Sequence, residues 1–132
     1  MYKAAIIIDS EQPTGLLANS VACIASGLFL DGKDYVGPEI QGKDVTYIPI
    51  TKIPILILKP GNRSLFELCK QARGMNLKFM AFTKEGQSTT DYNQYEKRVS
   101  GLPLDSVTLV GLGVVGEEKV VNSLVGSLPM LR

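Results

Sequence analysis

One long, largely apolar stretch, Gln12–Leu30 (QPTGLLANSVACIASGLFL), limits most strongly what this chain can fold into. It follows a short apolar run, Ala4–Ile8, and the two together are typical of a strand, a tight turn and a long helix. A helix that is apolar on most faces must be covered on most faces. We therefore expect a central helix that packs on a sheet and is covered again by another element or another subunit.

One row of this expected helix differs from the rest. Gly15, Asn19, Ala22 and Ser26 recur at the spacing of a single helix face, and all four are small. One interpretation is a close-packing groove in which Asn19 bonds to backbone. The other is that Thr14, Gly15 and Asn19 line a ligand cleft at the helix start, where free N–H groups favour an anion.

The composition is that of an ordinary soluble globular protein. The chain has 132 residues, of which 45% are apolar and 20% charged, and this predicts one domain over residues 1–132. The net charge of +1 lacks the basic excess of an autonomous nucleic-acid-binding protein. The N-terminal apolar run is too short for a signal peptide, and the helix is too short for a membrane span. We expect a cytoplasmic protein without membrane or nucleic-acid partners.

The sequence contains no histidine. This excludes Ser-His-Asp and Cys-His catalysis and any zinc site that uses imidazole. Acid–base chemistry would rest on Asp, Glu, Lys, Tyr, Cys or a bound water. Cys23 and Cys69 fall on apolar helix positions, so we expect both to be buried, reduced and inert. No metal site and no cofactor is predicted.

Strands and helices alternate along the rest of the chain. Strands are expected over residues 3–9, 53–58, 77–82 and 107–115. A helix capped by Ser64 and Glu67 follows the second strand, a short helix begins near Asp91, and the last helix covers residues 117–125. The composition of residues 31–53 predicts a loop or β-arm. Val45–Ile50 is expected as an edge strand, because Pro49 bars a central position. The alternation favours an α/β layer fold with a mostly parallel sheet.

In such sheets ligands bind at the carboxyl ends of the strands. If the first and third strands are parallel neighbours, this edge brings residues 9–19 close to the polar segment 83–91. Thr83 directly follows a buried strand, and Gln87 and Thr89 come soon after it. Asp9 ends the first strand and is either a general base or the cap of a turn. A solvated loop with a helix cap is the alternative for much of the polar segment.

Residues 111–116 (GLGVVG) match the dinucleotide-binding pattern G-x-G-x-x-G. The context contradicts that function, because too few residues follow to supply the ribose-binding acid. Glu117 and Glu118 would also place two carboxylates where a pyrophosphate should lie. We interpret these glycines as allowing a strand to pass close beneath a helix.

Both ends of the chain resemble a known superfamily. The helix start Pro13–Asn19 (PTGLLAN), the stretch from Phe82-Thr83 to Asp91-Tyr92 and the ending Gly126–Arg132 (GSLPMLR) are similar to an uncharacterised bacterial domain-of-unknown-function family, number two thousand. That family resembles the type-2 peptidyl-tRNA hydrolases. The resemblance implies a peptidyl-tRNA hydrolase type-2-like domain, a three-layer sandwich whose mixed, mostly parallel four-stranded sheet carries helices on both faces. It also implies a cleft beside the first helix.

The resemblance does not extend to the hydrolase's catalytic groups. With Ala18-Asn19 matched to the Ala-Gln of the hydrolases, their lysine position falls on Gly15 and their histidine position on Ala22. The position of their aspartate falls on Phe82. The lysine and the histidine that flank the glutamine position in the hydrolases are therefore absent, and Asn19 and Thr83 remain as polar neighbours.

Three functional hypotheses stay open. The first is a non-hydrolytic protein that binds a small polar or anionic ligand through Thr14, Gly15, Asn19, Thr83, Gln87 and Thr89. The second is a histidine-free hydrolase acting on peptidyl-tRNA or a related ester, in which Asp9 or Asp91 orients water and Lys84 is the electrophile. The third is a structural or partner-binding homodimer whose long helix is half covered by its twin. We expect a homodimer in any case, because so small a chain leaves apolar helix surface uncovered.

Overall fold

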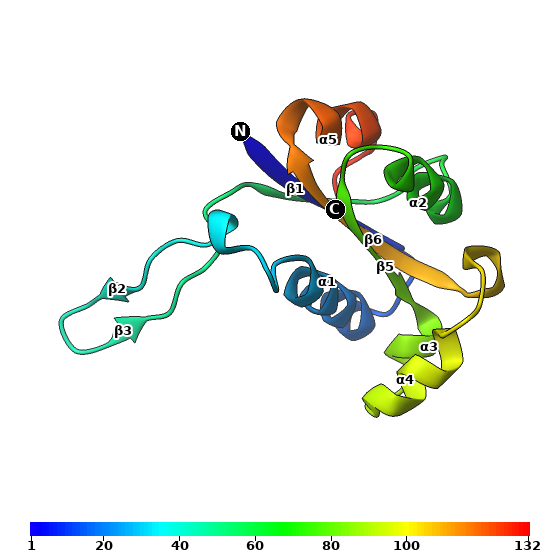
Figure 1. Cartoon of the computed structure of the whole chain (residues 1–132), viewed down its shortest axis with the longest axis horizontal. Coiled ribbons are helices and arrows are strands. Elements are labelled where there is room, and N and C mark those ends of the chain that lie inside the picture. Colours follow the sequence, from blue (N-terminus) through cyan, green and yellow to red (C-terminus); the bar gives the residue numbers. More distant parts are fainter.

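The computed structural model describes residues 1–132 and is built on one four-stranded sheet (Figure 1). Its strand order is β4-β1-β6-β5. The strands are β1 (Tyr2–Ile8), β4 (Ile55–Leu58), β5 (Lys78–Thr83) and β6 (Leu109–Glu117). The α/β class expected from the alternation of elements is confirmed.

The sheet is mixed, and its pairings differ from the expectation. β1 pairs in parallel with β4, whereas β6 lies between β1 and β5 and is antiparallel to both. Three strands point the same way, but the prediction of a mostly parallel sheet is wrong for the pairings. β6 is antiparallel to β5 because the connection between them stays at the carboxyl end of β5 and does not cross a face of the sheet. There the N–H of Lys84 donates to the Thr108 carbonyl at 2.8 Å.

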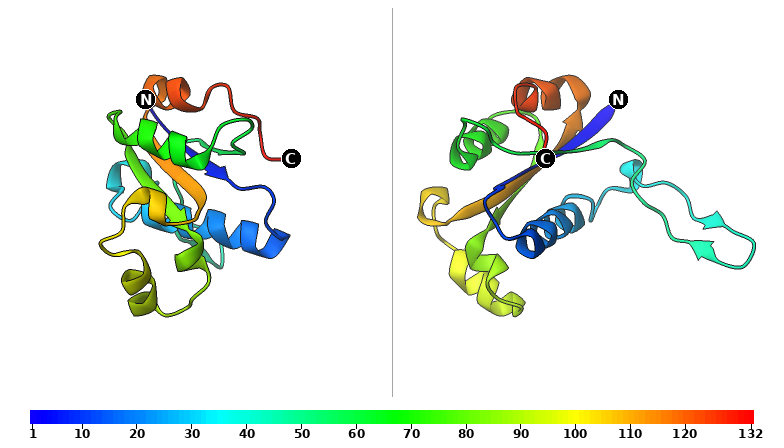
Figure 2. Two further views of the ribbon diagram at one scale, coloured as in Figure 1. Left: turned by 90° about the vertical axis from the view of Figure 1, so that its right-hand side faces the viewer. Right: turned by 180° about the vertical axis from the view of Figure 1, so that it is seen from behind.

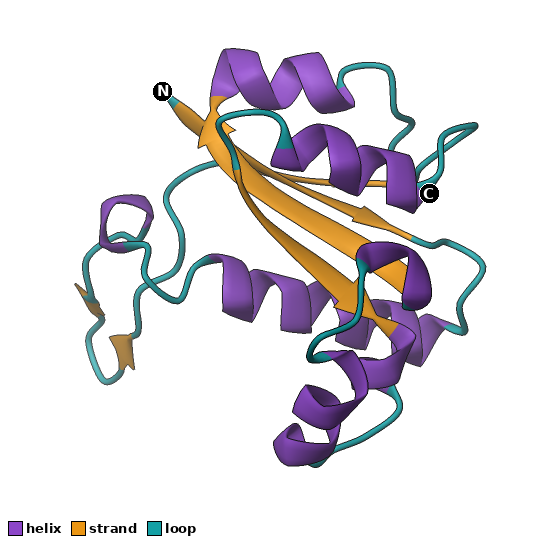
Figure 3. Ribbon diagram, turned by 45° about the vertical axis from the view of Figure 1, so that its right-hand side comes forward, coloured by secondary structure: helices purple, strands orange, loops and turns teal.

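Helices cover both faces of the sheet (Figure 3). α1 (Thr14–Leu28) packs on one face, across β6 and β5, and α2 (Leu65–Arg73) and α5 (Glu118–Val125) pack on the other. The side chains of β1 alternate between these layers, as a strand buried on both faces requires. Ile6 and Ile8 meet Ile24 of α1, whereas Ala5 and Ile7 belong to the core beneath α2 and α5.

Local signals placed the short helices correctly. The Ser64 hydroxyl accepts the N–H of Glu67 at 3.0 Å, and Gly74 ends α2, as the capping pattern predicted. Asp91 caps α4 (Tyr92–Val99) by accepting the N–H of Asn93 at 2.9 Å. A four-residue helix, α3 (Lys84–Gln87), and two 3-10 turns, η1 (Lys33–Tyr35) and η2 (Leu104–Ser106), complete the helical elements.

The glycines of β6 let α1 lie close to the sheet, which confirms that interpretation of the G-x-G-x-x-G pattern. A Cβ atom on Gly111 would lie 2.6 Å from Ile24 Cδ1 and 2.8 Å from Ile8 Cδ1. A Cβ atom on Gly113 would lie directly against Ile24 Cγ2. Ile24 therefore fills the space that side chains on these two positions would otherwise take.

α1 is covered on one side only, which corrects the expectation of a helix covered on most faces. Ser20, Ile24 and Leu28 are buried against the sheet. The row of Gly15, Asn19, Ala22 and Ser26 is exposed, so it is not a packing groove within this chain. Periodicity identified the helix but not the side on which the sheet lies. No helix in the structure is long and apolar enough to cross a bilayer.

Residues 37–52 form a projecting hairpin, which we call the arm (Figure 2). Its strands are β2 (Ile40–Gln41) and β3 (Thr46–Tyr47), and they pair only with each other. The predicted edge strand over Val45–Ile50 is thus shorter and does not join the main sheet. Pro49 lacks a backbone donor and interrupts the extended segment.

The C-terminal residues cover the open edge of β4. The N–H of Leu131 donates to the Ile57 carbonyl at 3.1 Å, and the N–H of Lys59 donates to the Pro129 carbonyl at 3.0 Å. This pairing satisfies backbone groups that an edge strand would leave open to another chain.

Candidate functional site

A cavity of about 530 Å³ lies between α1 and the segment formed by α3 and α4. It lies beside the carboxyl end of β5, the strand that α3 directly follows. One wall comes from α1 and the turn that follows it, and it consists of Asn19, Cys23, Ser26, Gly27 and Leu30. The opposite side is polar and aromatic and includes Gln87, Thr89, Asp91, Tyr92 and Tyr95. Its volume is typical of sites that hold small molecules.

Gln87 ties α3 to α1. Its amide nitrogen Nε2 donates to Ser20 Oγ at 2.6 Å, to Gln12 Oε1 at 2.8 Å and to the Leu16 carbonyl at 3.2 Å. Gln12 Nε2 in turn donates to the Asp9 carbonyl at 3.0 Å, so the network reaches the end of β1. Ser20 is fully buried. A satisfied polar network at this depth holds the two walls in one arrangement.

Short-range caps shape the segment opposite α1. Thr83 Oγ1 accepts the N–H of Gly86 at 3.1 Å and so begins α3. Thr89 Oγ1 accepts the N–H of Asp91 at 3.1 Å just before α4. Both bonds follow the tendency of threonine to bind backbone N–H groups two or three residues ahead.

Two tyrosines give the cavity an aromatic wall. The rings of Tyr92 and Tyr95 meet edge to face with centroids 5.5 Å apart. The Tyr95 ring lies over Gly86, where a Cβ atom would come within 2.7 Å of ring atoms. Burial, and then the neighbouring Tyr92, raise the pKa of the Tyr95 hydroxyl. Tyr95 is therefore a neutral phenol at physiological pH, able to donate or accept a hydrogen bond.

The charge of the cavity is negative. Asp91 is its one residue with a formal charge at neutral pH, and no lysine or arginine lines it. One carboxylate oxygen of Asp91 accepts the N–H of Asn93 as the cap of α4. An anion in this cavity would meet a carboxylate without a compensating cation.

The structure brings together half of the predicted ligand-binding residues. Asn19, Gln87 and Thr89 line the cavity. Thr14 and Gly15 are exposed at the start of α1 and line neither this cavity nor the second one described below. Thr83 is 5% exposed and its hydroxyl caps α3 instead of facing the cavity. The wall uses the middle and end of α1, not its first turn.

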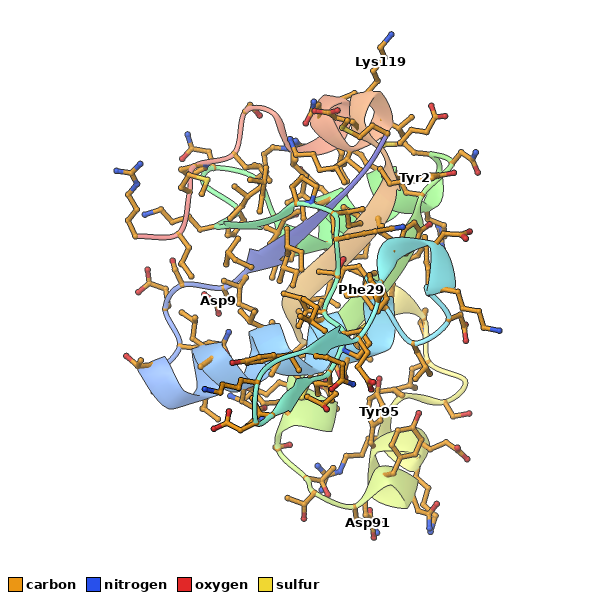
Figure 4. The ribbon with its side chains drawn as sticks, turned by 90° about the vertical axis from the view of Figure 1, so that its left-hand side faces the viewer. Tyr2, Asp9, Phe29, Asp91, Tyr95 and Lys119 are labelled. Atoms are coloured by element: carbon orange, nitrogen blue, oxygen red, sulfur yellow. The ribbon has the colours of Figure 1, made fainter.

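The three residues considered for catalysis do not converge. Asp9 lines a separate, shallow cavity of about 430 Å³ beside the start of α2, whereas Asp91 lines the cavity next to α4. Figure 4 shows the two aspartates well apart, with α1 between them in that view. Lys84 is exposed and lines neither cavity. Neither of these two cavities holds Asp9, Lys84 and Asp91 together.

Comparison with protein families decides the family of the chain. The family described as protein of unknown function (DUF2000) matches residues 2–132. The chain belongs to the DUF2000 family. This confirms the family to which the two ends of the sequence pointed. No curated protein matches the chain.

A solved structure shares the fold of this DUF2000 chain. It is that of Atu0240, a protein of unknown function from Agrobacterium tumefaciens. The two chains superpose with a TM-score of 0.87 at 16% sequence identity, over 98% of this chain and 96% of the other. At this identity the likeness shows the fold alone.

Several cavity residues of this DUF2000 chain were not predicted as site residues. A short helix was expected to begin near Asp91, but nothing local indicated that its residues Tyr92 and Tyr95 turn toward α1. Ser26 is one of the four small residues of the α1 row, and only its membership of that row could have indicated a site. Gln12 and Gln87 meet across 75 positions in sequence, a contact that no local pattern encodes.

A thiol reagent applied to the native protein should modify Cys23 and spare Cys69. The expectation that both are buried is wrong for Cys23, which is half-buried and lines the cavity. Cys69 is fully buried, and burial raises the pKa of its thiol to about 11, so its thiolate is scarce at pH 8. Titration with Ellman's reagent before and after denaturation measures the difference. A Cys23→Ser variant should lose the fast phase, and persistence of that phase would contradict the assignment.

Proposed function

We propose that this chain is a non-hydrolytic binding protein on a peptidyl-tRNA hydrolase-like scaffold. Its ligand is a small, neutral or cationic organic molecule held between α1 and α4. The proposal rests on the composition of the cavity, whose volume is about 530 Å³. Tyr92, Tyr95 and Asp91 line one side of it, and Asn19 lines the other. Apolar walls with a few convergent polar groups are typical of small-molecule sites.

Charge decides between the ligand classes considered from the sequence. A cation gains from the Asp91 carboxylate and from the faces of Tyr92 and Tyr95, which attract positive charge. An anion gains from neither. The anionic ligand expected at the start of α1 would also lie at Thr14 and Gly15, which are outside the cavity. A polar ligand with an ammonium or an uncharged head group fits the site better.

Asn19 and Gln87 are suited to different roles in this site. Asn19 is exposed, and the one hydrogen bond of its side chain is a weak bond that Oδ1 accepts from the Cys23 thiol at 3.8 Å. Its donors are thus free for a ligand. Gln87 Nε2 donates its hydrogen bonds to Ser20, Gln12 and the Leu16 carbonyl. We assign Asn19 to ligand orientation and Gln87 to holding the wall.

The proposed scaffold rests on the resemblance of the helix start and the C-terminus to the type-2 hydrolases. Gly15 and Ala22 take the positions of the hydrolase lysine and histidine, and both are exposed on α1. Together with the separation of Asp9 from Asp91, this favours binding over hydrolysis. No contact in the structure favours the histidine-free hydrolase specifically.

Three probes of matched size test the proposal: benzyltrimethylammonium, benzyl alcohol and benzylphosphonate. Binding followed by amide chemical shifts should be tightest for the cation, weaker for the alcohol and weakest for the phosphonate. The shifted signals should come from residues 19–30, in α1 and the turn after it, and from residues 86–95. Preference for the phosphonate, or shifts at the cavity near Asp9, would contradict the proposed ligand class and site.

Replacing Asn19 with leucine should weaken binding of the best probe about tenfold, because one buried polar group of the complex then loses its partner. The melting temperature should stay within about 2 °C of wild type, since the exposed Asn19 holds no backbone group in place. Ala18→Leu is the matched control, because Ala18 is exposed on α1 and lies outside the cavity. A clear loss of stability in Asn19→Leu would mean that Asn19 has a structural role.

A further inference from the structure

The arm carries the densest group of exposed apolar side chains in the chain. Ile40, Tyr47, Ile48 and Ile50 are 61%, 57%, 79% and 78% exposed, and Val45 is 50% exposed. Exposed apolar side chains gathered in one short segment are typical of interaction sites in soluble proteins. The arm has no core of its own, because β2 and β3 pair at two positions only, and isolated two-stranded hairpins are marginal in water.

The base of the arm is fixed and its tip is free. The N–H of Lys52 donates to the Tyr35 carbonyl at 2.7 Å, and the Tyr35 ring meets Tyr2 and Phe29 edge to face. Beyond this base the hairpin extends from the C-terminal end of α1 away from the sheet and all other helices (Figures 1 and 2). The arm therefore does not cover any surface of its own chain.

α1 presents a second uncovered surface. Gly15, Asn19, Ala22 and Ser26 are exposed, with Leu16 and Leu30 beside them at 45% and 81% exposure. The whole segment 12–30 contains no Asp, Glu, Lys or Arg. A helix face turned permanently to water is normally charged, whereas the centre of a protein interface is depleted of charge.

We propose that two copies of this chain form a dimer in which each arm packs on the exposed α1 row of the other copy. Because a dimer with two-fold symmetry repeats each contact, the arm and the α1 row of both copies are covered in one assembly. Small residues on the row leave room for the large arm residues, and a Cβ on Gly15 would meet nothing within 4 Å. Five large arm side chains that are at least half exposed, with the α1 row, offer on the order of the 800 Å² per subunit that stable interfaces bury.

The charges of the arm favour a protein surface over a membrane. Residues 37–52 hold two acids, Glu39 and Asp44, and two lysines, Lys43 and Lys52. A hairpin that inserts into an anionic lipid surface needs a basic excess, which this arm lacks. The α1 row carries no charge, so neither surface opposes the other electrostatically.

The proposed contact also bears on the cavity between α1 and α4. Asn19 and Ser26 belong both to the exposed row and to the cavity wall, and the neighbouring Leu30 also lines the cavity. An arm lying along the row would form an outer rim of the cavity from the second copy. The dimer does not depend on the ligand, because its argument uses only the uncovered surfaces.

Two charge substitutions test the contact. Ile48→Lys places a charge on the arm and Ala22→Glu places one on the α1 row; both positions are exposed, so both variants should fold. Wild type should be a dimer by sedimentation equilibrium. Either variant alone should dissociate about 100-fold more readily, because each symmetric dimer contains the altered contact twice at about tenfold each. Ser123→Glu, exposed on α5, is the matched control and should stay dimeric.

Mixing the two variants gives the decisive result. Their heterodimer contains one wild-type arm–row contact and one in which lysine meets glutamate, so its affinity should return to within about tenfold of wild type. A monomeric wild type, or dimers that neither variant weakens, would overturn the proposal. If only Ala22→Glu dissociates the dimer, the contact is between the helices, and if only Ile48→Lys dissociates it, the contact is between the arms. Either result would contradict the proposed contact of arm and row. Loss of dimer in both variants without recovery on mixing would also overturn it.

Discussion

Replacing Gly113 with alanine should destabilise the protein by about 3 kcal/mol and lower its melting temperature by roughly 10 °C. The added Cβ would lie directly against Ile24 Cγ2 and 3.2 Å from Leu28 Cδ2. Cγ2 is bonded to the Cβ of Ile24, so it cannot move aside by rotation of a distant torsion, and α1 itself must shift. Such a shift would separate the helix from the face of β6 on which Ile24 packs. Thermal melts followed by circular dichroism measure the loss.

A compensating substitution isolates the cause. Ile24→Ala removes the obstructing atoms, so the Gly113→Ala/Ile24→Ala double variant should lose less stability than the two single variants added together. Gly15→Ala is the matched control on the same helix. A Cβ there meets nothing within 4 Å, and alanine should raise stability by about 0.5–1 kcal/mol. Equal destabilisation at Gly15 and Gly113 would mean that close packing of α1 on β6 is not the reason for the glycine.

The elements of this fold were predictable where the physical cause is local. The buried strand β1 follows from five successive apolar residues, all of them 0% exposed. The start of α2 follows from Ser64 and Glu67, three residues apart and joined by one hydrogen bond. The glycines of β6 were recognised as packing residues because Glu117 and Glu118 made an anion site there unfavourable. In each case the signal lies within a few neighbouring residues of the sequence.

What could not be predicted depends on contacts between distant segments. The sequences of β5 and β6 do not indicate that β6 lies between β1 and β5. That order depends on the connection from β5 to β6, which stays at the carboxyl end of β5 and does not cross a face of the sheet. The helical period of α1 is the same whether one side or every side is covered. Here only the sheet-facing side is covered, which leaves Ala22 and Ser26 exposed. The expectation of full coverage assumed a partner within the chain.

The candidate site was predicted in part for the same reason. Asn19 and Gln87 were chosen because polar residues near strand ends tend to meet at the carboxyl edge, and both line the cavity. Thr83 was chosen on the same rule but satisfies the N–H of Gly86 three residues ahead. Tyr92 and Tyr95 of α4 complete the site, and their place beside α1 depends on how the α3–α4 segment lies against α1 rather than on the sequence of α4 alone.

Replacing Gln87 with leucine should release the α3–α4 segment from α1 while the sheet and α1 stay folded. Leucine has a similar size but cannot replace the hydrogen bonds from Nε2 to Ser20, Gln12 and the Leu16 carbonyl. The loss should cost about 1–2 kcal/mol and appear locally, because these are the side-chain bonds that join α3 to α1. Hydrogen exchange should accelerate at the amides of α4 and remain slow in β1 and β6. Gln94→Leu, on the exposed side of α4, should leave exchange unchanged.

The Tyr95 hydroxyl gives an independent measurement of the same event. Burial and the neighbouring Tyr92 raise its pKa above 10.0 in the folded protein. A group whose pKa is raised by folding stabilises the protein below its unfolded pKa, and this contribution is lost as the pH rises through the folded pKa. Wild type should therefore lose stability above about pH 10. In Gln87→Leu the released Tyr95 should titrate closer to its ordinary value, as ultraviolet difference spectra can record, and the alkaline loss from this group should shrink. An unchanged Tyr95 titration together with slow exchange in α4 would show that the wall of the cavity is held by packing and not by Gln87.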